Sequence, residues 1–247
     1  MNWLLLRGLM READHWGDFP KDLEAQEGVD RVLCLDLPGV GTESSRIFIP
    51  SIKQAVEDLR SRLAIHLQDK GDEEWGILGI SLGGMIAMQW AHDYPNDFKK
   101  IVVMNSSARS APLWKRLTLP SLAVVAECFL EKDLVKREKK IIDMVLNLRK
   151  NDLKVIDSWI KIAQKNNFSK LTAVNQITAA SLFELPSRIK IPMLVLTSRA
   201  DRMVNYECSV QIAEKFKAPI KIHPSAGHDI AIDDSKWIVE QIKDWRI

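Results

Sequence analysis

The chain of 247 residues contains little cysteine: its three cysteines, Cys34, Cys128 and Cys208, lie far apart and form no CxxC pair. An odd number of widely spaced cysteines argues against a disulfide framework and against a zinc site. Long apolar runs are also missing, because the longest early run, residues 3–6, is too short for a signal peptide or a membrane span. We therefore expect a cytoplasmic, reduced protein without a membrane span.

Charge of one sign is not in excess over the whole chain, since 35 Lys and Arg face 33 Asp and Glu, but it is unevenly distributed. Residues 109–190 carry 16 basic and 8 acidic side chains, and the remainder carries 19 and 25. The length suits one domain, or one domain with a large insertion, and the basic segment indicates a separate structural unit. Basic segments of this kind usually form helix faces exposed to solvent. Alternatively, the segment binds an acidic partner or an anionic substrate.

Short apolar runs alternate with longer segments of helical period. Six runs predict strands buried on both faces of a parallel sheet: 3–6, 32–35, 75–80, 101–104, 193–197 and 220–222. Four segments predict helices: 51–68, with Ser51 as its cap, 82–92, 206–216 and 235–245. This alternation predicts an α/β architecture with helices on both faces of the sheet.

The alternation breaks between Met104 and Ile191, where about four helical patterns occur without a good strand. We expect residues 111–186 to form a helical lid inserted into a core made of residues 1–110 and 187–247. Ligands of parallel α/β sheets bind outside the carboxyl ends of the strands, so a lid placed there would cover an active site.

The clearest motif is Gly-Ile-Ser-Leu-Gly-Gly at residues 79–84, between a predicted strand and a predicted helix. In that setting a G-x-S-x-G sequence is typical of a nucleophile elbow, which exposes the serine above the sheet. Gly79 and Gly83 lack the Cβ atoms that would collide in such a turn. Ser81 is therefore the predicted nucleophile; a serine that only caps the helix is the alternative.

A serine nucleophile needs a base, and five histidines are available. His228 lies between the last predicted strand and helix, at the same sheet edge as Ser81, and is the predicted base. Asp201, just after the fifth predicted strand, is the predicted carboxylate that orients the histidine. Asp229, which adjoins the histidine, and Asp36, which begins a turn, are the weaker candidates. The order Ser, Asp, His is the order of an α/β-hydrolase triad.

Acyl chemistry also needs two backbone N–H donors for the oxyanion, and we predict those of Leu9 and Leu82. His15, in the first loop, is a candidate for the pocket rim. Candidates in the lid for lining an acyl pocket have large apolar side chains, although packing between lid and core is an alternative for each. They are Leu113, Trp114, Leu117, Leu122, Val125, Phe129, Trp159 and Phe168.

The chain resembles the α/β-hydrolase superfamily over essentially its whole length. The residues that carry the resemblance are Gly8-Leu9, residues 36–41, residues 79–84, Asp201 and Gly227-His228. The resemblance implies an α/β-hydrolase fold of about six mostly parallel strands with a helical lid, lacking the usual N-terminal hairpin because the chain starts at the family's third strand. One departure is Arg7-Gly8, where the family usually has His-Gly.

Within the superfamily, the chain is similar to small carboxylesterases, including the methyl ester esterase that acts on carrier-bound pimeloyl groups. The similarity implies a serine ester hydrolase with a small-molecule ester substrate, no cofactor, no metal and no nucleic-acid partner. An acidic carrier protein docked on the basic run 136–140 is a further hypothesis. One alternative is a lyase or C–C bond hydrolase that uses the same triad on an anionic substrate, held by Arg7, Arg11, Arg109 or Arg202. The other is a binding protein on a hydrolase scaffold.

Overall fold

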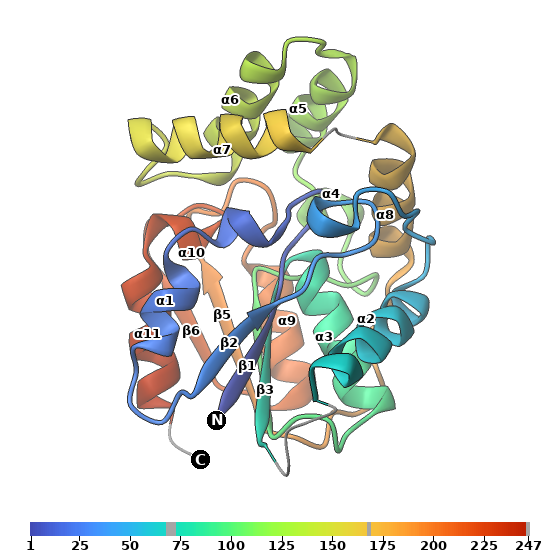
Figure 1. Ribbon diagram of the computed structural model, residues 1–247, viewed down its shortest axis with the longest axis vertical. Coiled ribbons are helices and arrows are strands. Elements are labelled where there is room, and N and C mark those ends of the chain that lie inside the picture. Colours follow the sequence, from blue (N-terminus) through green and yellow to red (C-terminus); the bar gives the residue numbers. More distant parts are fainter. Residues whose placement is uncertain (68–72, 167–168, 246–247) are drawn as a thin grey trace.

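The computed structural model describes residues 1–67, 73–166 and 169–245, and its centre is a six-stranded sheet (Figure 1). The strands are β1 (Asn2–Leu6), β2 (Arg31–Cys34), β3 (Trp75–Ile80), β4 (Lys100–Met104), β5 (Met193–Ser198) and β6 (Ile220–His223). Their order across the sheet is β2-β1-β3-β4-β5-β6, and every pairing among the described strands is parallel. The six predicted strands are confirmed, each to within one residue at either end.

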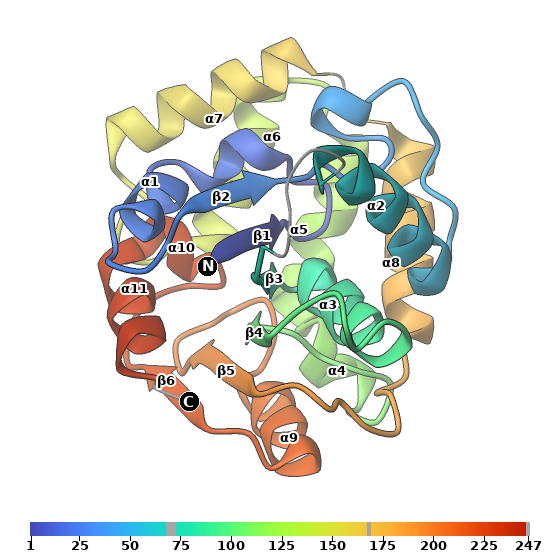
Figure 2. The same cartoon turned by 60° about the horizontal axis from the view of Figure 1, so that its bottom comes forward.

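The four central strands, β1, β3, β4 and β5, are buried on both faces, and this explains why they are almost continuously apolar, whereas the edge strands β2 and β6 are only partly buried. Leu4 and Leu6 of β1 pack into one apolar cluster, and Trp3 and Leu5 pack into the other, because successive side chains point to opposite faces. Figure 2 shows the sheet between two helical layers. The helices of the first layer are α2 (Ile52–Leu67), α3 (Leu82–Asp93) and α9 (Glu207–Phe216), and those of the second are α1 (Phe19–Glu24), α10 (Ile230–Asp233) and α11 (Ser235–Asp244).

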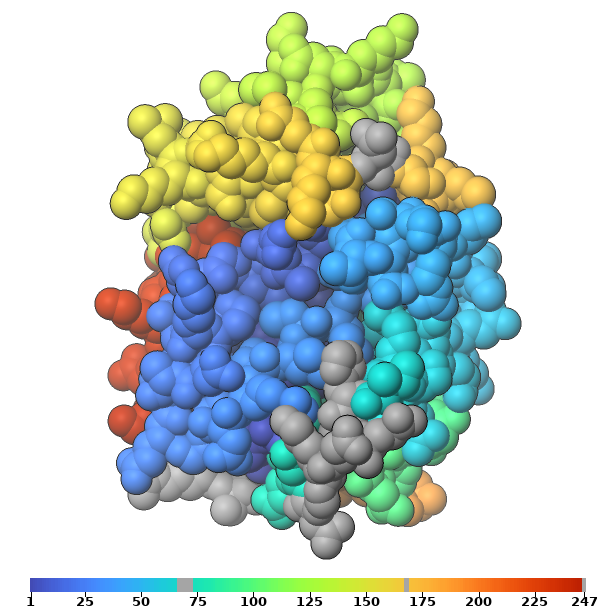
Figure 3. All heavy atoms as spheres, in the orientation of Figure 1, coloured from blue at the N-terminus to red at the C-terminus, as the bar shows by residue number. Residues whose placement is uncertain are grey.

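The segment between β4 and β5 is helical, as predicted, and forms a lid. Its helices are α4 (Leu113–Arg116), α5 (Leu119–Leu130), α6 (Leu134–Val145), α7 (Leu153–Lys165) and α8 (Lys170–Leu182). Helices α5, α6 and α7 lie above the carboxyl ends of the strands (Figures 1 and 3). Helix α8 runs down beside α3, and its Ala179 belongs to the same apolar cluster as the sheet. The last helix of the inserted segment is therefore packed as part of the core.

The longer helices match their predictions. Helix α2 begins after Ser51, whose hydroxyl accepts a hydrogen bond from the Gln54 N–H at 3.4 Å, and its predicted end at Gln68 lies outside the described residues. The helices predicted at 82–92, 206–216 and 235–245 are α3, α9 and α11, with one end of each shifted by one residue. Helices α1 and α10 were not predicted, because six and four residues are too few to show a helical period. In the described ranges, no helix combines the length and the apolarity needed to cross a bilayer.

Candidate active site

Ser81 lies on a tight turn between β3 and α3, with φ 56° and ψ −118°. A positive φ is strained for serine, and such strain concentrates at functional sites. The turn requires glycine on both sides, since a Cβ at Gly79 would lie 2.2 Å from the Gly83 carbonyl oxygen, and one at Gly83 would lie 2.2 Å from that of Leu6. A Cβ at Gly8 would lie 3.1 Å from the Cβ of Ser81. The end of β1 and the serine turn are thus in close contact.

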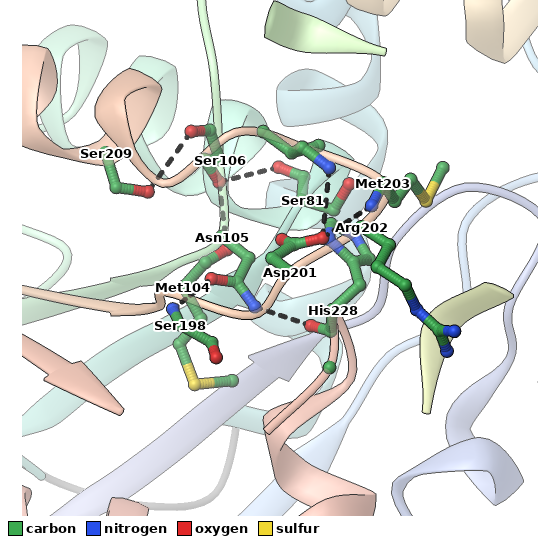
Figure 4. Close-up of polar contacts among 12 residues, drawn as sticks. Ser81, Met104, Asn105, Ser106, Ser198, Asp201, Arg202, Met203, Ser209 and His228 are labelled. Atoms are coloured by element: carbon green, nitrogen blue, oxygen red, sulfur yellow. Dashed lines mark hydrogen bonds and ion pairs between the residues drawn. The ribbon is translucent and has the colours of Figure 1, made fainter. Parts of the chain in front are cut away.

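The loops after β5 and β6 bring Asp201 and His228 together at the same edge of the sheet as Ser81 (Figure 4). His228 Nδ1 and Asp201 Oδ2 are 2.7 Å apart. Asp201 Oδ1 accepts hydrogen bonds from the N–H groups of Met203, at 2.8 Å, and Val204, at 3.0 Å. The buried carboxylate is therefore held in one orientation, facing the imidazole. Among the described residues, Ser81 Oγ makes no hydrogen bond to His228. Hydrogen bonds between catalytic groups are often long or absent in a free enzyme and form when substrate binds.

The protonation of His228 depends on five features of its surroundings. Burial lowers its pKa, whereas the charge of Asp201, the hydrogen bond to Asp201 and the charge of Asp229 raise it; Arg7 lowers it. The net result is a pKa raised above the ordinary histidine value of 6.5. The imidazolium that would form during proton transfer is therefore stabilised, chiefly by Asp201.

Asn105 and Ser106, directly after β4, form a polar network behind these residues that was not predicted from the sequence (Figure 4). Asn105, at φ 45°, donates through Nδ2 to the carbonyl oxygen of His228 at 2.6 Å and accepts from the Ser198 N–H at 3.1 Å. Ser106 Oγ donates to the carbonyl oxygen of Ser81 at 2.8 Å. The signal in the sequence is a run of three small polar residues directly after a buried strand.

The two predicted oxyanion donors come from the residue after Ser81 and from the loop after β1. Leu82 opens α3, so its N–H has no acceptor one turn earlier in the helix. Leu9, in the loop after β1, lines the same cavity as Ser81. Across the described residues neither N–H has a hydrogen-bond acceptor, whereas the N–H of Met10 donates to Gln176 Oε1 at 2.8 Å. Both amides are thus available to a ligand.

Beneath the lid, a cavity of about 90 Å³ opens onto Ser81 and His228. Phe129 of α5, a predicted pocket residue, lines this cavity. The other lid side chains around it are also mostly apolar; they include Val125, Ile141, Met144, Ala173 and Ile177. The described part of the chain has no group of three or more His, Cys, Asp or Glu side chains that could hold a metal ion. The site therefore offers an apolar chamber beside one serine and one histidine.

Six of the predicted pocket residues do not line this cavity, and these predictions are corrected: His15, Leu113, Trp114, Leu117, Leu122 and Trp159. Trp114 of α4 is 64% exposed. Its burial could not be predicted, because the sequence pattern of a four-residue helix does not indicate which face meets the core. His15 is buried, with its ring 5.2 Å from that of Trp159 and its Nε2 2.8 Å from Arg11 Nη1. Burial, followed by the charges of Arg11 and Arg7, holds the pKa of His15 well below its ordinary value. Phe168 lies outside the described residues.

Arg7, the departure from the family's His-Gly, forms a buried ion pair with Asp229. Arg7 Nη1 lies 3.2 Å from Asp229 Oδ1, Nη2 bonds the second carboxylate oxygen, and each side chain is 4% exposed. The guanidinium carbon is 4.5 Å from the ring centre of Trp16, a distance typical of cation–π contact. Asp229 therefore faces Arg7, and the pair joins the loop after β1 to the loop that carries His228.

The other candidate arginines divide into one that lines the cavity and two that do not. Arg11 lines it, and its Nη1 is 2.9 Å from Glu138 Oε2 of α6. Arg109 pairs with Glu184 at the surface, and Arg202 donates to carbonyl oxygens at the end of α6. Both arginines in the cavity are thus already paired with a carboxylate.

Comparisons with known proteins give relatives along most of the chain. It is 26% identical over 219 residues to the pimeloyl-[acyl-carrier protein] methyl ester esterase of Vibrio campbellii, an alignment of 86% of this chain and 81% of that protein. It is 23% identical over 233 residues to a 2-hydroxy-6-oxononadienedioate/2-hydroxy-6-oxononatrienedioate hydrolase of Burkholderia vietnamiensis, covering 91% and 80%. A shorter match, 39% identical over 84 residues, spans 34% of this chain but only 21% of the homoserine O-acetyltransferase of Thermus thermophilus.

The crystal structure of a lipase-esterase related protein from Clostridium acetobutylicum has the same fold, with a TM-score of 0.77 at 17% identity over 99% of this chain and 94% of that chain. Residues 4–235 match the family model described as serine aminopeptidase, S33. Because this match covers nearly the whole chain, the protein belongs to the serine aminopeptidase S33 family of the α/β-hydrolase superfamily.

Proposed function

We propose that the protein is a serine hydrolase that cleaves carboxylic esters through an acyl-enzyme. The observation that carries the proposal is the 2.7 Å contact between His228 and Asp201, because His228 lines the same cavity as Ser81. Ser81 Oγ attacks the acyl carbon while His228 Nε2 takes its proton and then returns it to the leaving alcohol. Water, activated by the same imidazole, hydrolyses the acyl-enzyme. Asp201 holds the imidazole in the required tautomer.

The N–H groups of Leu9 and Leu82 are the proposed oxyanion donors. A carbonyl oxygen that becomes negatively charged needs donors that are already oriented and not occupied by other acceptors. Both N–H groups lack an acceptor among the described residues; Leu82 directly follows Ser81, and Leu9 lines the same cavity as Ser81. The positive end of α3 adds to this stabilisation, because Leu82 opens the helix.

The substrate class follows from the charge balance of the cavity. Arg7 is neutralised by Asp229, and Arg11 is paired with Glu138, so the lining offers little uncompensated positive charge. The rest of the lining is mostly apolar, which favours a neutral acyl chain. We therefore place an uncharged carboxylic ester ahead of a dianionic substrate.

The second candidate is a lyase or C–C bond hydrolase that acts on an anionic substrate with the same three residues. It is favoured by the presence of Arg7 and Arg11 in the cavity and by the relative whose named substrate is a dioate. Inertness toward every simple ester, combined with turnover of a dicarboxylate, would favour this candidate. Docking of an acidic carrier protein at residues 136–140 stays a prediction: Lys136 and Lys139 are exposed there, but Glu138 is buried.

The acyl site is tested with p-nitrophenyl esters from acetate to dodecanoate. Val125 and Phe129 lie one turn apart on α5 and both line the cavity. We expect Val125→Trp to lower kcat/KM for the longest accepted ester by about ten-fold, since two buried methylene groups contribute about 1.6 kcal/mol. We expect Phe129→Ala to move the optimum toward longer chains. Leu122→Ala, on the same helix but exposed, is the control; an equal change in all three variants would contradict the assignment.

The pH dependence of kcat/KM is expected to report His228 in the free enzyme. Only the neutral imidazole accepts the serine proton, and its pKa is raised, so activity should fall on the acid side with an apparent pKa above 6.5. Asp201→Asn removes the main group that raises this pKa and should move the acid limb to lower pH. A wild-type limb below 6.5, measured in a pH–rate profile, would contradict the assignment of His228 as the base.

A further inference from the structure

The turn that follows lid helix α6 contacts both loops of the candidate triad. Asn147, in this turn, donates through Nδ2 to the carbonyl oxygen of Ala200 at 2.9 Å and to that of Ser225 at 3.1 Å. Ala200 directly precedes Asp201, and Ser225 lies three residues before His228. One lid side chain thus uses both of its amide hydrogens to bridge the loop of the carboxylate and the loop of the histidine.

A carboxylate on α10 binds the same turn to the histidine loop. Asp233 accepts hydrogen bonds from the N–H groups of Asn147 at 2.9 Å, Leu148 at 3.0 Å and Arg149 at 3.0 Å. It also accepts from the N–H of Gly227, the residue before His228, at 2.6 Å. Four donors converge on one buried side chain, so the turn and the histidine loop are fixed relative to each other.

The end of α6 is also bound from the side of Asp201. Arg202, the next residue, donates to the carbonyl oxygens of Leu146, at 2.8 Å, and Asp143. Asp143 belongs to the last turn of α6 and Leu146 directly follows the helix, so neither carbonyl oxygen has an acceptor role within the helix. On the other side, the N–H of Asp229 donates to the carbonyl oxygen of Val145 at 3.0 Å.

We propose that the turn after α6, residues 146–149, is a fixed part of the catalytic apparatus, and that Asn147 is a positioning residue that sets the separation of the Asp201 and His228 loops. The proposal rests on the proposed function of those two residues. Asn147 does not line the cavity, so it acts through the loops and not on the substrate. Asn105 makes a second bridge, between the end of β5 at Ser198 and the loop of His228.

The experiment compares Asn147→Ala and Asn147→Ser with the same substitutions at Asn175. Asn175 is a matched control, because it is a half-buried lid asparagine whose Nδ2 donates to a core carbonyl, that of Phe48, at 2.8 Å, far from both loops. We expect Asn147→Ala to lower kcat for p-nitrophenyl esters by about ten-fold or more with KM nearly unchanged, since a small misplacement of catalytic groups has such effects. Asn147→Ser, which keeps one donor, should have a smaller effect, and it remains measurable if the alanine variant does not fold.

The pH profile separates positioning from a general loss of stability. His228 is faced by Asp201, Asp229 and Arg7, and of these Asp201 raises its pKa most. If Asn147 holds Asp201 in place, Asn147→Ala should shift the acid limb to lower pH, while Asn175→Ala should leave it unchanged. Equal kcat values and equal pH profiles for the Asn147 and Asn175 variants would overturn the proposal.

An NMR titration of the His228 imidazole makes the test independent of the substrate. Its resonance is assigned by its loss in His228→Gln. If the wild type hydrolyses no ester, the proposed function fails, but a lowered pKa of His228 in Asn147→Ala would still support the positioning role. An unchanged pKa of His228 in that variant would overturn the role, whatever the activity of the enzyme.

Discussion

Replacing Ser81 with alanine is expected to reduce the hydrolysis of p-nitrophenyl esters by about 10⁴-fold, the usual scale when a member of a serine triad is removed. The alanine variant keeps the backbone turn and both N–H groups proposed to bind the oxyanion, but it has no hydroxyl oxygen to attack the acyl carbon. The fold should persist, because the Ser81 hydroxyl makes no hydrogen bond to another described residue. Steady-state kinetics of the purified wild type and variant measure the effect.

Ser110→Ala is the matched control, since Ser110 is an exposed serine away from the cavity. Phenylmethylsulfonyl fluoride should add one sulfonyl group to the wild type and to Ser110→Ala but none to Ser81→Ala, as read by intact-protein mass spectrometry. An ester hydrolase activity that survives in Ser81→Ala, or an adduct on another residue, would show that the nucleophile lies elsewhere.

Removing Asp229 alone is expected to destabilise the protein by about 3–5 kcal/mol, the scale observed when one partner of a buried ion pair is deleted. Arg7 and Asp229 are each 4% exposed, so Asp229→Ala leaves a guanidinium buried against Trp16 without a counter-charge. Desolvation of that charge is then no longer offset by the carboxylate. Urea denaturation followed by circular dichroism gives the free energy of unfolding, provided the transition is two-state.

Two further variants show whether burial causes the loss. Glu184→Gln breaks an exposed pair with Arg109 and should change the free energy of unfolding by less than about 1 kcal/mol. The double variant with Arg7→Met and Asp229→Leu removes both charges and should recover part of the stability lost in Asp229→Ala. If Asp229→Ala and Glu184→Gln lower the free energy of unfolding equally, the buried pair between Arg7 and Asp229 does not stabilise the protein more than an exposed pair does.

The core of the fold was predictable from local patterns. A strand covered on both faces must be apolar at nearly every position, and this holds for the four central strands. The shorter apolar runs of the edge strands β2 and β6 were also identified to within one residue. The longer helices showed a clear period, whereas α1 and α10 are too short to do so. The parallel direction of the strands then followed, because a helix between two successive strands returns the chain to the edge at which the first strand began.

The positions of Asp201 and His228 were predictable for the same reason. Each follows a strand, and the carboxyl ends of parallel strands meet at one edge, where the glycine-rich turn also places Ser81. Asp201 was preferred to Asp229 because Asp229 adjoins the histidine and was expected to point elsewhere. The structure places Asp201 against His228 and turns Asp229 toward Arg7.

Local sequence patterns did not predict which side chains of the lid line the cavity. Phe129 lines the cavity and Trp114 is exposed, although both are large aromatic residues on lid helices. A helical period indicates that one face is buried, but it does not say which part of the core that face meets. His15 likewise follows β1, as predicted, but its ring packs edge-on against that of Trp159 and does not line the cavity.

By itself, the sequence determined the strands, the main helices, the serine turn and the loops that carry Asp201 and His228, because each depends on residues close together in the chain. Only the tertiary structure decided the pairing of Arg7 with Asp229, which are 222 positions apart, and the bridge from Asn147 to both loops. The first contact depends on how the strands place their loops at one edge of the sheet, and the second on how the lid lies over that edge. That arrangement results from the packing of many side chains at once, and no short stretch of sequence encodes it.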